Sequence, residues 1–307
     1  MRTLIDTKMS KIEESIETIV YRNIDDEFLK DLILQYVDYQ SKKGFPFGEL
    51  LVLHYQLYNG PETDEIYEVA AAVEILILAF DILDDFEDKD IHTKPWAIRT
   101  HLALNATTAM QFLSGEIIRN SSFTNKEHAL SIFFQYCLKS INAQHKDLLN
   151  NCRSEADYIN MTLGKSGSLV TFACLLGASL AADEYPKEIE EYSKYIGLIG
   201  QINNDLEDLK NWKEKNDFIH RKYTLPIIYL LNCKHEETMF IHQYYQNKLS
   251  KNQLLKNRQV IERRLLESGA IHYTNVIKKI YQNETINILK KLNIDSYYFN
   301  QLLKYIL

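Results

Sequence analysis

Glycine and proline are scarce in this chain, with 10 glycines and 5 prolines among 307 residues. Sheets joined by many tight turns need more of both, because these two residues supply the backbone angles of turns. The scarcity therefore argues against a β-rich fold and favours long helices. Hydrophobic residues make up 46% of the chain, which is enough for a sizeable core.

Cysteine is also rare, and its few positions are scattered. The four cysteines form no Cys-x-x-Cys pair and have no histidine at metal-ligand spacing (Cys137, Cys152, Cys174 and Cys233). This pattern predicts neither a zinc site nor a disulfide framework. It is typical of reduced core cysteines in a cytoplasmic protein.

A basic excess and a long uncharged apolar run are both missing. The formal net charge of −7 argues against nucleic acid as a partner. The N-terminus is too polar for a signal peptide, and no apolar run reaches the roughly 18 residues that span a bilayer without including a charge. We therefore expect a cytoplasmic protein without a transmembrane segment, and we leave a peripheral association with a membrane open.

Apolar residues recur at three- and four-residue intervals along most of the chain, which is the spacing of a buried helix face. The segments expected to be helical are 9–22, 26–41, 50–58, 69–90, 100–118, 126–150, 155–182, 189–208 and 224–231, with a charged loop at 211–222. No repeat, low-complexity tract or long linker divides them. We predict one all-α domain over residues 1–307, a single-domain bundle of roughly ten or more helices.

The segment 69–90 begins with a long apolar run and ends in a dense group of acids. Asp81, Asp84, Asp85 and Asp88 are spaced i, i+3, i+4 and i+7, so their carboxylates leave one face of a helix. Like charges this close repel one another, and bound divalent cations would offset the repulsion. Carboxylate oxygens suit Mg²⁺, with a phosphate filling its remaining positions. The alternative is a solvated helix end without a bound ion.

A second apolar helix, 189–208, also ends in acid. Its last turns hold Asn204, Asp205 and Asp208, with Gln201 one turn earlier. Clusters of carboxylates that face one another across a helical bundle are a known way to build a metal site. The two acid-tipped helices are therefore predicted to hold metal ions between them.

Two lysines stand where a polyphosphate would need positive charge. Lys165 lies in GKSGSLV (164–170), and Lys222 lies in RKYTLP (221–226). The first stretch is not a P-loop, because Ile159 stands where that motif needs glycine and no strand precedes it. Each lysine alone would be an ordinary surface lysine. Together with the two acid clusters they fit a metal-bound diphosphate, since ammonium groups pair well with phosphate.

The order of these motifs, DDxxD, K-[ST]-G, QxxxDxxD and KxTxP, resembles the trans-isoprenyl diphosphate synthases over most of the chain. The resemblance implies an isoprenoid synthase-like bundle around a central cavity for diphosphate and Mg²⁺. It implies metal binding by two sets of residues (Asp84, Asp85 and Asp88; Asn204, Asp205 and Asp208). It implies contacts to the diphosphate from Lys165, Gln201 and Lys222, with catalytic roles for the first Asp set and the two lysines. Asn204 replaces the aspartate of the family, so a third ion is expected to bind more weakly.

The departures from that family concern its second substrate, isopentenyl diphosphate. The family holds it with a GKxxRP stretch, a histidine on the central helix and an Arg-Arg-Gly after the acids. The corresponding regions here read KKGFPF (42–47), Ile77 and IHTKPW (91–96). A second diphosphate would lack guanidinium partners, and buried unpaired charge is costly. We therefore expect a different acceptor.

One branch of the family fits this departure, the ComQ-type enzymes, which prenylate a tryptophan of a small precursor peptide in bacterial quorum sensing. The run EILILAFDILDDFED (74–88) resembles theirs. The resemblance implies a Mg²⁺-dependent prenyltransferase that moves a geranyl or farnesyl group from its diphosphate to such a peptide, maturing a pheromone. Phe80, one turn before Asp84, is expected either to floor the pocket for the prenyl chain or to be plain core.

Three alternatives remain open at this point. The first is a short-chain trans-prenyl diphosphate synthase that condenses an allylic diphosphate with isopentenyl diphosphate. The others are a terpene cyclase and an inactive regulatory subunit on the same fold. The retained acids and lysines argue against the regulatory subunit. The sequence leaves a homodimer open.

Overall fold

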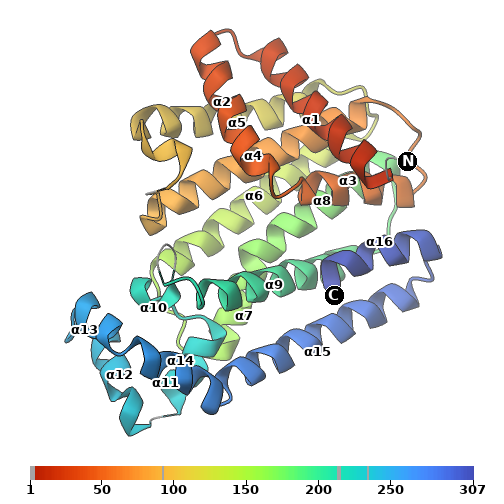
Figure 1. The fold of residues 1–307 in the computed structure, drawn as a ribbon. Coiled ribbons are helices and arrows are strands. Elements are labelled where there is room, and N and C mark those ends of the chain that lie inside the picture. The colour runs from red at the N-terminus through yellow and green to blue at the C-terminus, as the bar shows by residue number, and fades with distance from the viewer. Residues whose placement is uncertain (1–3, 92, 213–215, 234) are drawn as a thin grey trace. The chain divides into compact units, whose positions relative to one another are not determined.

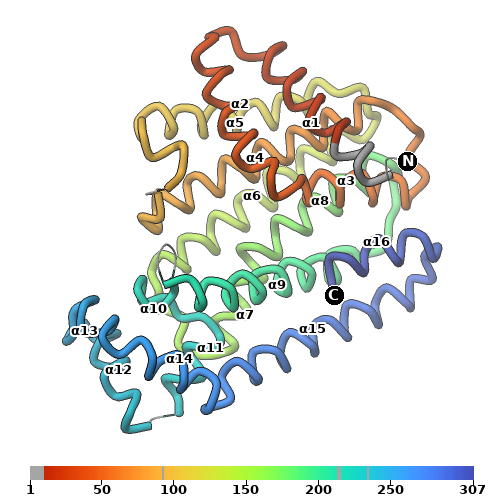
Figure 2. Tube along the Cα trace, in the orientation of Figure 1, coloured from red at the N-terminus to blue at the C-terminus, as the bar shows by residue number. Residues whose placement is uncertain are grey.

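The structure is a computed structural model that describes residues 4–91, 93–212, 216–233 and 235–307 (Figures 1 and 2). Helices supply the regular structure of these residues, and no strand occurs among them. The all-α prediction is therefore confirmed. The chain divides into two compact units, residues 1–138 with 169–190 and residues 139–168 with 191–307. A single domain over residues 1–307 stays a prediction.

The two units share helices α6 (Lys126–Leu148), α8 (Ser166–Ala181) and α9 (Glu188–Asp208). The first unit also contains α1 (Leu4–Asn23), α2 (Glu27–Ser41), α3 (Pro46–Leu57), α4 (Glu65–Asp88), the 3₁₀ helix η1 (Pro95–Ala97) and α5 (Thr100–Asn120). The second also contains α7 (Glu155–Gly164), α10 (Asp217–His220), α11 (Leu225–Asn232), the 3₁₀ helix η2 (Glu236–Thr238), α12 (Met239–Tyr245), α13 (Lys251–Lys256), α14 (Arg258–Glu267), α15 (Ala270–Lys291) and α16 (Ser296–Ile306).

Helix α4 is the buried axis of the first unit. It packs against α1, α3 and α5, and its residues from Val69 to Ala79 are all buried. A helix that is apolar on every side needs such surroundings, which explains why no polar face interrupts this segment. The helix ends at Asp88, because Lys89 adopts a left-handed backbone with φ of 60°. The predicted central helix is confirmed, and its acids lie in its last two turns.

A buried carboxyl ties α4 to the start of α3. The side chain of Glu74 is 7% exposed and accepts a hydrogen bond of 2.5 Å from the backbone N–H of Gly48. A Cβ atom on Gly48 would lie 3.2 Å from the Cγ atom of Glu74, so glycine permits this approach. Burial raises the pKa of Glu74 to about 8, although the amides of Gly48 and Phe47 act in the opposite direction.

This pKa predicts that Glu74 destabilises the protein as the pH rises. The folded chain keeps the proton up to about pH 8, whereas the unfolded chain loses it near its model value of 4.5. The free energy of unfolding should therefore fall between those two pH values, by about 5 kcal/mol at most. Glu74→Gln should remove this contribution, because its amide oxygen still accepts from Gly48 without a charge.

Urea unfolding at pH 5.5 and pH 8 checks this expectation in both proteins. The parent should lose more stability than Glu74→Gln over that interval, and the difference isolates Glu74 from the other titrating groups. Equal pH dependence in the two proteins would contradict the prediction.

One helix prediction was wrong. Residues 155–182 were expected to form one helix, but the structure breaks the segment into α7 and α8 at Lys165, whose ψ is −86°. The flanking glycines explain the break, since glycine is a weak helix former and permits close packing. A Cβ atom on Gly197 of α9 would lie 2.6 Å from the Cα atom of Gly167, so the two backbones meet directly. At this break the Lys165 side chain reaches Asp147 of α6, with its Nζ atom 3.0 Å from the carboxylate.

The loop predicted at 211–222 was also partly wrong, because α10 occupies residues Asp217–His220. Asn216 begins this short helix by accepting a hydrogen bond from the amide of Phe218. Residues 213–215 lie outside the described residues. The single turn was missed because four residues are too few to show a helical period.

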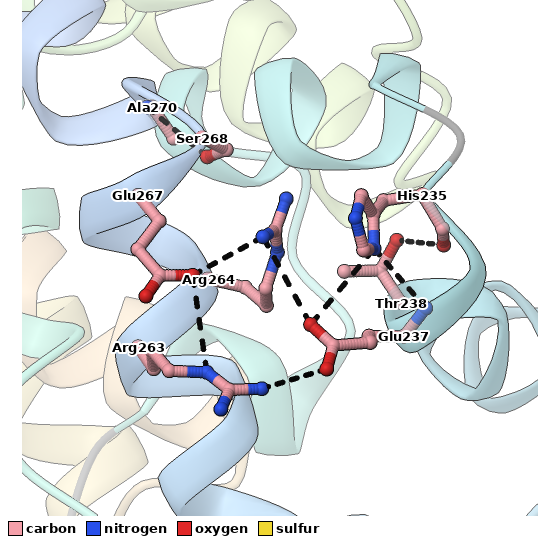
Figure 3. A network of polar contacts seen from close by, with 8 residues as sticks. All are labelled: His235, Glu237, Thr238, Arg263, Arg264, Glu267, Ser268 and Ala270. Carbon is pink, nitrogen blue, oxygen red and sulfur yellow. Dashed lines mark hydrogen bonds and ion pairs between the residues drawn. The ribbon is translucent and has the colours of Figure 1, made fainter.

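A charged cluster fastens η2 to α14 in the second unit (Figure 3). Glu237 accepts a hydrogen bond of 2.8 Å from Arg263 and lies 3.9 Å from Arg264. Glu267 lies 3.2 Å from Arg264, so two carboxylates balance two guanidinium groups. These pairs are partly exposed, so each contributes little to stability.

One stretch, Glu155–Ala181, is long and apolar enough to cross a membrane by length and composition. Its most apolar window is 72% buried inside the protein, and the stretch contains the break at Lys165. A core helix of a folded protein passes the same test, so the stretch is weak support for a membrane span.

Candidate functional site

The first acid cluster lies at the end of α4 in the first unit. Asp84, Asp85 and Asp88 are partly exposed there, while Asp81 is exposed and lies 3.4 Å from the amide nitrogen of Gln40. Within the described ranges, no three acidic, histidine or cysteine side chains gather into a preformed metal site. The assignment of these aspartates to a metal therefore stays a prediction.

The loop that follows α4 contacts Asp85. Its Oδ2 atom accepts a hydrogen bond of 3.1 Å from the indole N–H of Trp96 and lies 3.4 Å from the Nζ atom of Lys94. Trp96 is 1% exposed, and its ring meets Tyr36 and Tyr39 of α2 edge to face. Lys94 and Trp96 were expected in this loop, but their contact with Asp85 was not predicted from the sequence.

The second acid cluster lies at the end of α9 in the second unit. Asp205 is 4% exposed, accepts a hydrogen bond of 2.8 Å from Gln201, and accepts another from the hydroxyl of Tyr158 on α7. Burial raises the pKa of Asp205 to about 6, although the two hydrogen bonds lower it. Asn204 is exposed and Asp208 is partly exposed. Gln201 thus hydrogen-bonds within the cluster, and its contact with a diphosphate stays a prediction.

The two predicted diphosphate lysines come together in the same unit. The Nζ atoms of Lys165 and Lys222 lie 3.0 Å and 3.7 Å from one carboxylate oxygen, Oδ2 of Asp147 on α6. All three side chains are mostly buried. Negative charge on Asp147 also raises the pKa of Asp205, so the lysine pair and the second cluster share one electrostatic environment. The structure thus gathers charges that are far apart in the sequence.

Sequence reasoning missed Asp147 and Tyr158. Asp147 is an acid in the last turn of a helix, and nothing in its spacing to Lys165 or Lys222 marks it. Tyr158 lies on α7 and precedes Lys165, the residue at which that helix ends, by seven positions, close to two helical turns. That spacing was the only signal for Tyr158, and buried tyrosines share it.

The backbone beside Lys222 is held by its neighbours. Its carbonyl accepts a hydrogen bond of 2.9 Å from the Tyr245 hydroxyl, and its amide donates to the carbonyl of Asp217 at 2.9 Å. Arg221 adopts a left-handed backbone with φ of 53°, and its guanidinium lies 4.0 Å from the ring centre of Tyr244. A residue in that conformation needs support. The contacts therefore fix where the Lys222 side chain starts.

The donor atoms in both clusters fit magnesium. The predicted ligands are carboxylate oxygens and one amide oxygen, with no sulfur or imidazole among them. Mg²⁺ prefers such oxygen donors, and it uses few protein ligands where a phosphate supplies the others. The lysine pair in the second unit supplies positive charge suited to that phosphate.

Comparison with known proteins agrees with this chemistry. The polyprenyl synthetase family profile matches residues 28–262. A tryptophan prenyltransferase ComQ from Bacillus subtilis subsp. natto (strain BEST195) is 38% identical over 294 residues, which cover 95% of this chain and 90% of that protein. Another of the same name from Bacillus subtilis (strain 168) is 32% identical, covering 91% and 92%.

Solved structures agree on the fold. Geranylgeranyl pyrophosphate synthetase from Pyrococcus horikoshii Ot3 is similar with a TM-score of 0.80 and 19% identity, covering 98% of this chain and 96% of that one. Heptaprenyl diphosphate synthase from Staphylococcus aureus has a TM-score of 0.80 and 17% identity, covering 100% and 98%. This chain therefore belongs to the polyprenyl synthetase family and is a prenyltransferase.

Proposed function

We propose that this protein transfers a prenyl group from an allylic diphosphate to a tryptophan of a small precursor peptide. The observation that carries the proposal is the meeting of Lys165 and Lys222 at one oxygen of Asp147. Two ammonium groups a few ångströms apart form a site for a polyanion. The tryptophan acceptor is supported by the similarity to the tryptophan prenyltransferases of Bacillus subtilis.

The charges of the second unit act on the leaving group. When the C–O bond of the allylic diphosphate breaks, its electron pair leaves with the diphosphate. Lys165 and Lys222 stabilise that growing negative charge. Gln201 is proposed to contact the diphosphate from α9, where its amide donates a hydrogen bond to Asp205. Mg²⁺ would supply Lewis-acid stabilisation of the same charge, and its proposed ligands are Asp84, Asp85 and Asp88 of the first cluster and Asn204, Asp205 and Asp208 of the second.

The remaining allylic cation needs an electron-rich partner and protection from water. An indole ring provides both an attractive face for a cation and a nucleophilic carbon. The new C–C bond forms at that ring carbon as the indole loses a proton. Exclusion of water from the pocket would prevent the cation from being quenched as an alcohol.

Phe80 is proposed to limit the prenyl chain to a geranyl or farnesyl group. It lies one turn before Asp84 on α4 and is only partly buried, whereas Ala79 and Ile82 beside it are fully buried. A phenylalanine that served only to fill the core would be expected to be as fully buried as Ala79 and Ile82. The partial burial of Phe80 supports a position of its ring at the edge of the proposed prenyl pocket.

The acceptor is proposed to be a peptide pheromone precursor in the cytoplasm, and not isopentenyl diphosphate. In the loop after the acids, Lys94 forms an ion pair with Asp85, so its charge is already engaged within the protein. The central helix carries buried Ile77 where a histidine would be needed. Both features support an acceptor without a diphosphate.

A transfer assay tests this function. The purified protein with Mg²⁺ receives geranyl or farnesyl diphosphate and a synthetic peptide that contains one tryptophan. The expected result is diphosphate release together with a peptide that gains one prenyl group, as measured by mass spectrometry. The control peptide carries phenylalanine in place of tryptophan and should stay unmodified.

Two results would contradict the proposal. One is efficient elongation of the allylic donor with isopentenyl diphosphate, which would favour a chain-elongating synthase. The other is equal modification of the control peptide, which would exclude tryptophan as the acceptor. Comparing the rates with the two donors also measures the preferred chain length.

A further inference from the structure

Asp147 is an acid in an electrostatically unfavourable place, the last turn of α6. The carbonyl groups at that end of a helix carry partial negative charge, so a carboxylate there is disfavoured. Two ammonium groups offset this repulsion, because Lys165 donates a hydrogen bond of 3.0 Å to Oδ2 of Asp147 and the Nζ atom of Lys222 lies 3.7 Å from the same oxygen. The Asp147 side chain is 17% exposed and each lysine side chain 19%, so water screens their charges weakly.

Backbone contacts keep Asp147 beside both lysines. The amide of Asn150 donates a hydrogen bond of 2.8 Å to the carbonyl of Asp147. The side-chain amide of Asn150 donates another of 2.8 Å to the carbonyl of Arg221, which precedes the second lysine in the chain. On the other side, the Ser140 hydroxyl of α6 donates to the carbonyl of Lys165 at 3.2 Å. The end of α6 is thus fastened to the backbone next to each ammonium group, which holds the carboxylate in place between them.

We infer that Asp147 is a fixed counter-ion that limits how tightly the lysine pair holds diphosphate, so that the product can leave after each transfer. The inference rests on the proposed function, in which Lys165 and Lys222 bind the diphosphate. Two ammonium groups beside one carboxylate carry a single net positive charge, whereas the lysines alone would carry two. A bound diphosphate is therefore attracted less strongly than the lysines alone would attract it.

This effect acts on donor and product alike, since both carry the diphosphate. It therefore weakens binding uniformly and does not favour the bond-breaking step. What it gains is release, which limits the turnover of many enzymes. A purely structural role for Asp147 predicts the opposite result. If the carboxylate only held the lysines together, its loss would let the two ammonium groups repel one another and diphosphate binding would weaken.

Calorimetry with inorganic diphosphate and Mg²⁺ separates these two roles. Asp147→Asn keeps the shape of the side chain and an oxygen that accepts from Lys165, but it removes the negative charge. Its dissociation constant for diphosphate should fall about tenfold or more, because one unit of repulsion is lost in a weakly screened site. Unchanged, weaker or undetectable binding in Asp147→Asn would overturn the inference.

Two further variants make the measurement specific. Glu284→Gln removes one negative charge from an exposed position on α15 of the same unit, and its affinity for diphosphate should stay parental. The double variant with Asp147→Asn and Lys222→Met restores the parental net charge of the site, so its dissociation constant should rise back toward the parental value. A double variant that binds as tightly as Asp147→Asn would show that the effect does not act through the lysine pair. Circular dichroism verifies that each variant keeps its helices.

Release is measured by displacing bound radiolabelled diphosphate with an excess of the unlabelled ion. The dissociation rate constant should fall about tenfold or more in Asp147→Asn, since changes in affinity at one site appear mostly in dissociation. Tighter binding that came from faster association alone would overturn the role in release. Neither measurement needs a prenyl donor or a tryptophan peptide. A failure of transfer to tryptophan would therefore count against the proposed function and leave these results unchanged.

Discussion

Asp88→Asn should lower the rate of prenyl transfer by about 10³-fold while leaving the helices intact, because it removes a carboxylate from the group that would hold Mg²⁺ against the diphosphate. Asp88 is partly exposed in the last turn of α4. Its loss also relieves repulsion among neighbouring acids, so the fold should not suffer. The measurement is the single-turnover rate with a saturating donor, alongside circular dichroism.

Glu87→Gln is the matched control for that experiment. It removes one negative charge from the adjacent position, but Glu87 is exposed and belongs to neither metal set. We expect near-parental activity from it. A fully active Asp88→Asn protein would show that the acid cluster does not bind the ion needed for transfer.

Lys222→Met should lower kcat/KM for the allylic diphosphate by about 10²- to 10³-fold, the usual loss for one donor that stabilises developing charge. The ammonium of Lys222 shares the Asp147 oxygen with Lys165, in a mostly buried setting where charge is weakly screened. Methionine keeps the length and apolar stem of the side chain. The loss should therefore report charge and not packing.

Lys210→Met provides the comparison, since the side chain of Lys210 is 70% exposed and pairs only locally with Glu207. Its kcat/KM should stay near that of the parent. Binding of inorganic diphosphate, measured by calorimetry, should weaken in Lys222→Met alone. Equal activity in the two variants would remove Lys222 from the site.

Much of the fold was predictable because its helices carry strong local signals. The acids of α4 and α9 follow long apolar runs, and the structure places each group at the end of its predicted helix. The break at Lys165 was not predictable in this way. It depends on the contact of Gly167 with Gly197, thirty residues along the chain, and such a contact leaves no trace in local periodicity.

The same reason explains which site residues were found. Lys165 and Lys222 belong to short motifs, whereas Asp147 acquires its role only when folding brings both lysines to it. Trp96 was visible in the sequence, but its hydrogen bond to Asp85 depends on how the loop folds back onto α4. Motifs therefore identified the charged groups, and tertiary structure identified the residues that orient them.

The contact of Gly167 with Gly197 has a consequence for protein engineering. A Cβ atom on Gly197 would meet the Gly167 backbone at 2.6 Å, so even alanine must push α8 and α9 apart. Gly167 lies two residues from Lys165, and Gly197 lies four residues from Gln201. A library that randomises this seam would therefore lose activity as steeply as one that randomises the charged groups, although neither glycine takes part in the chemistry. Attempts to alter donor or acceptor choice should leave both positions fixed.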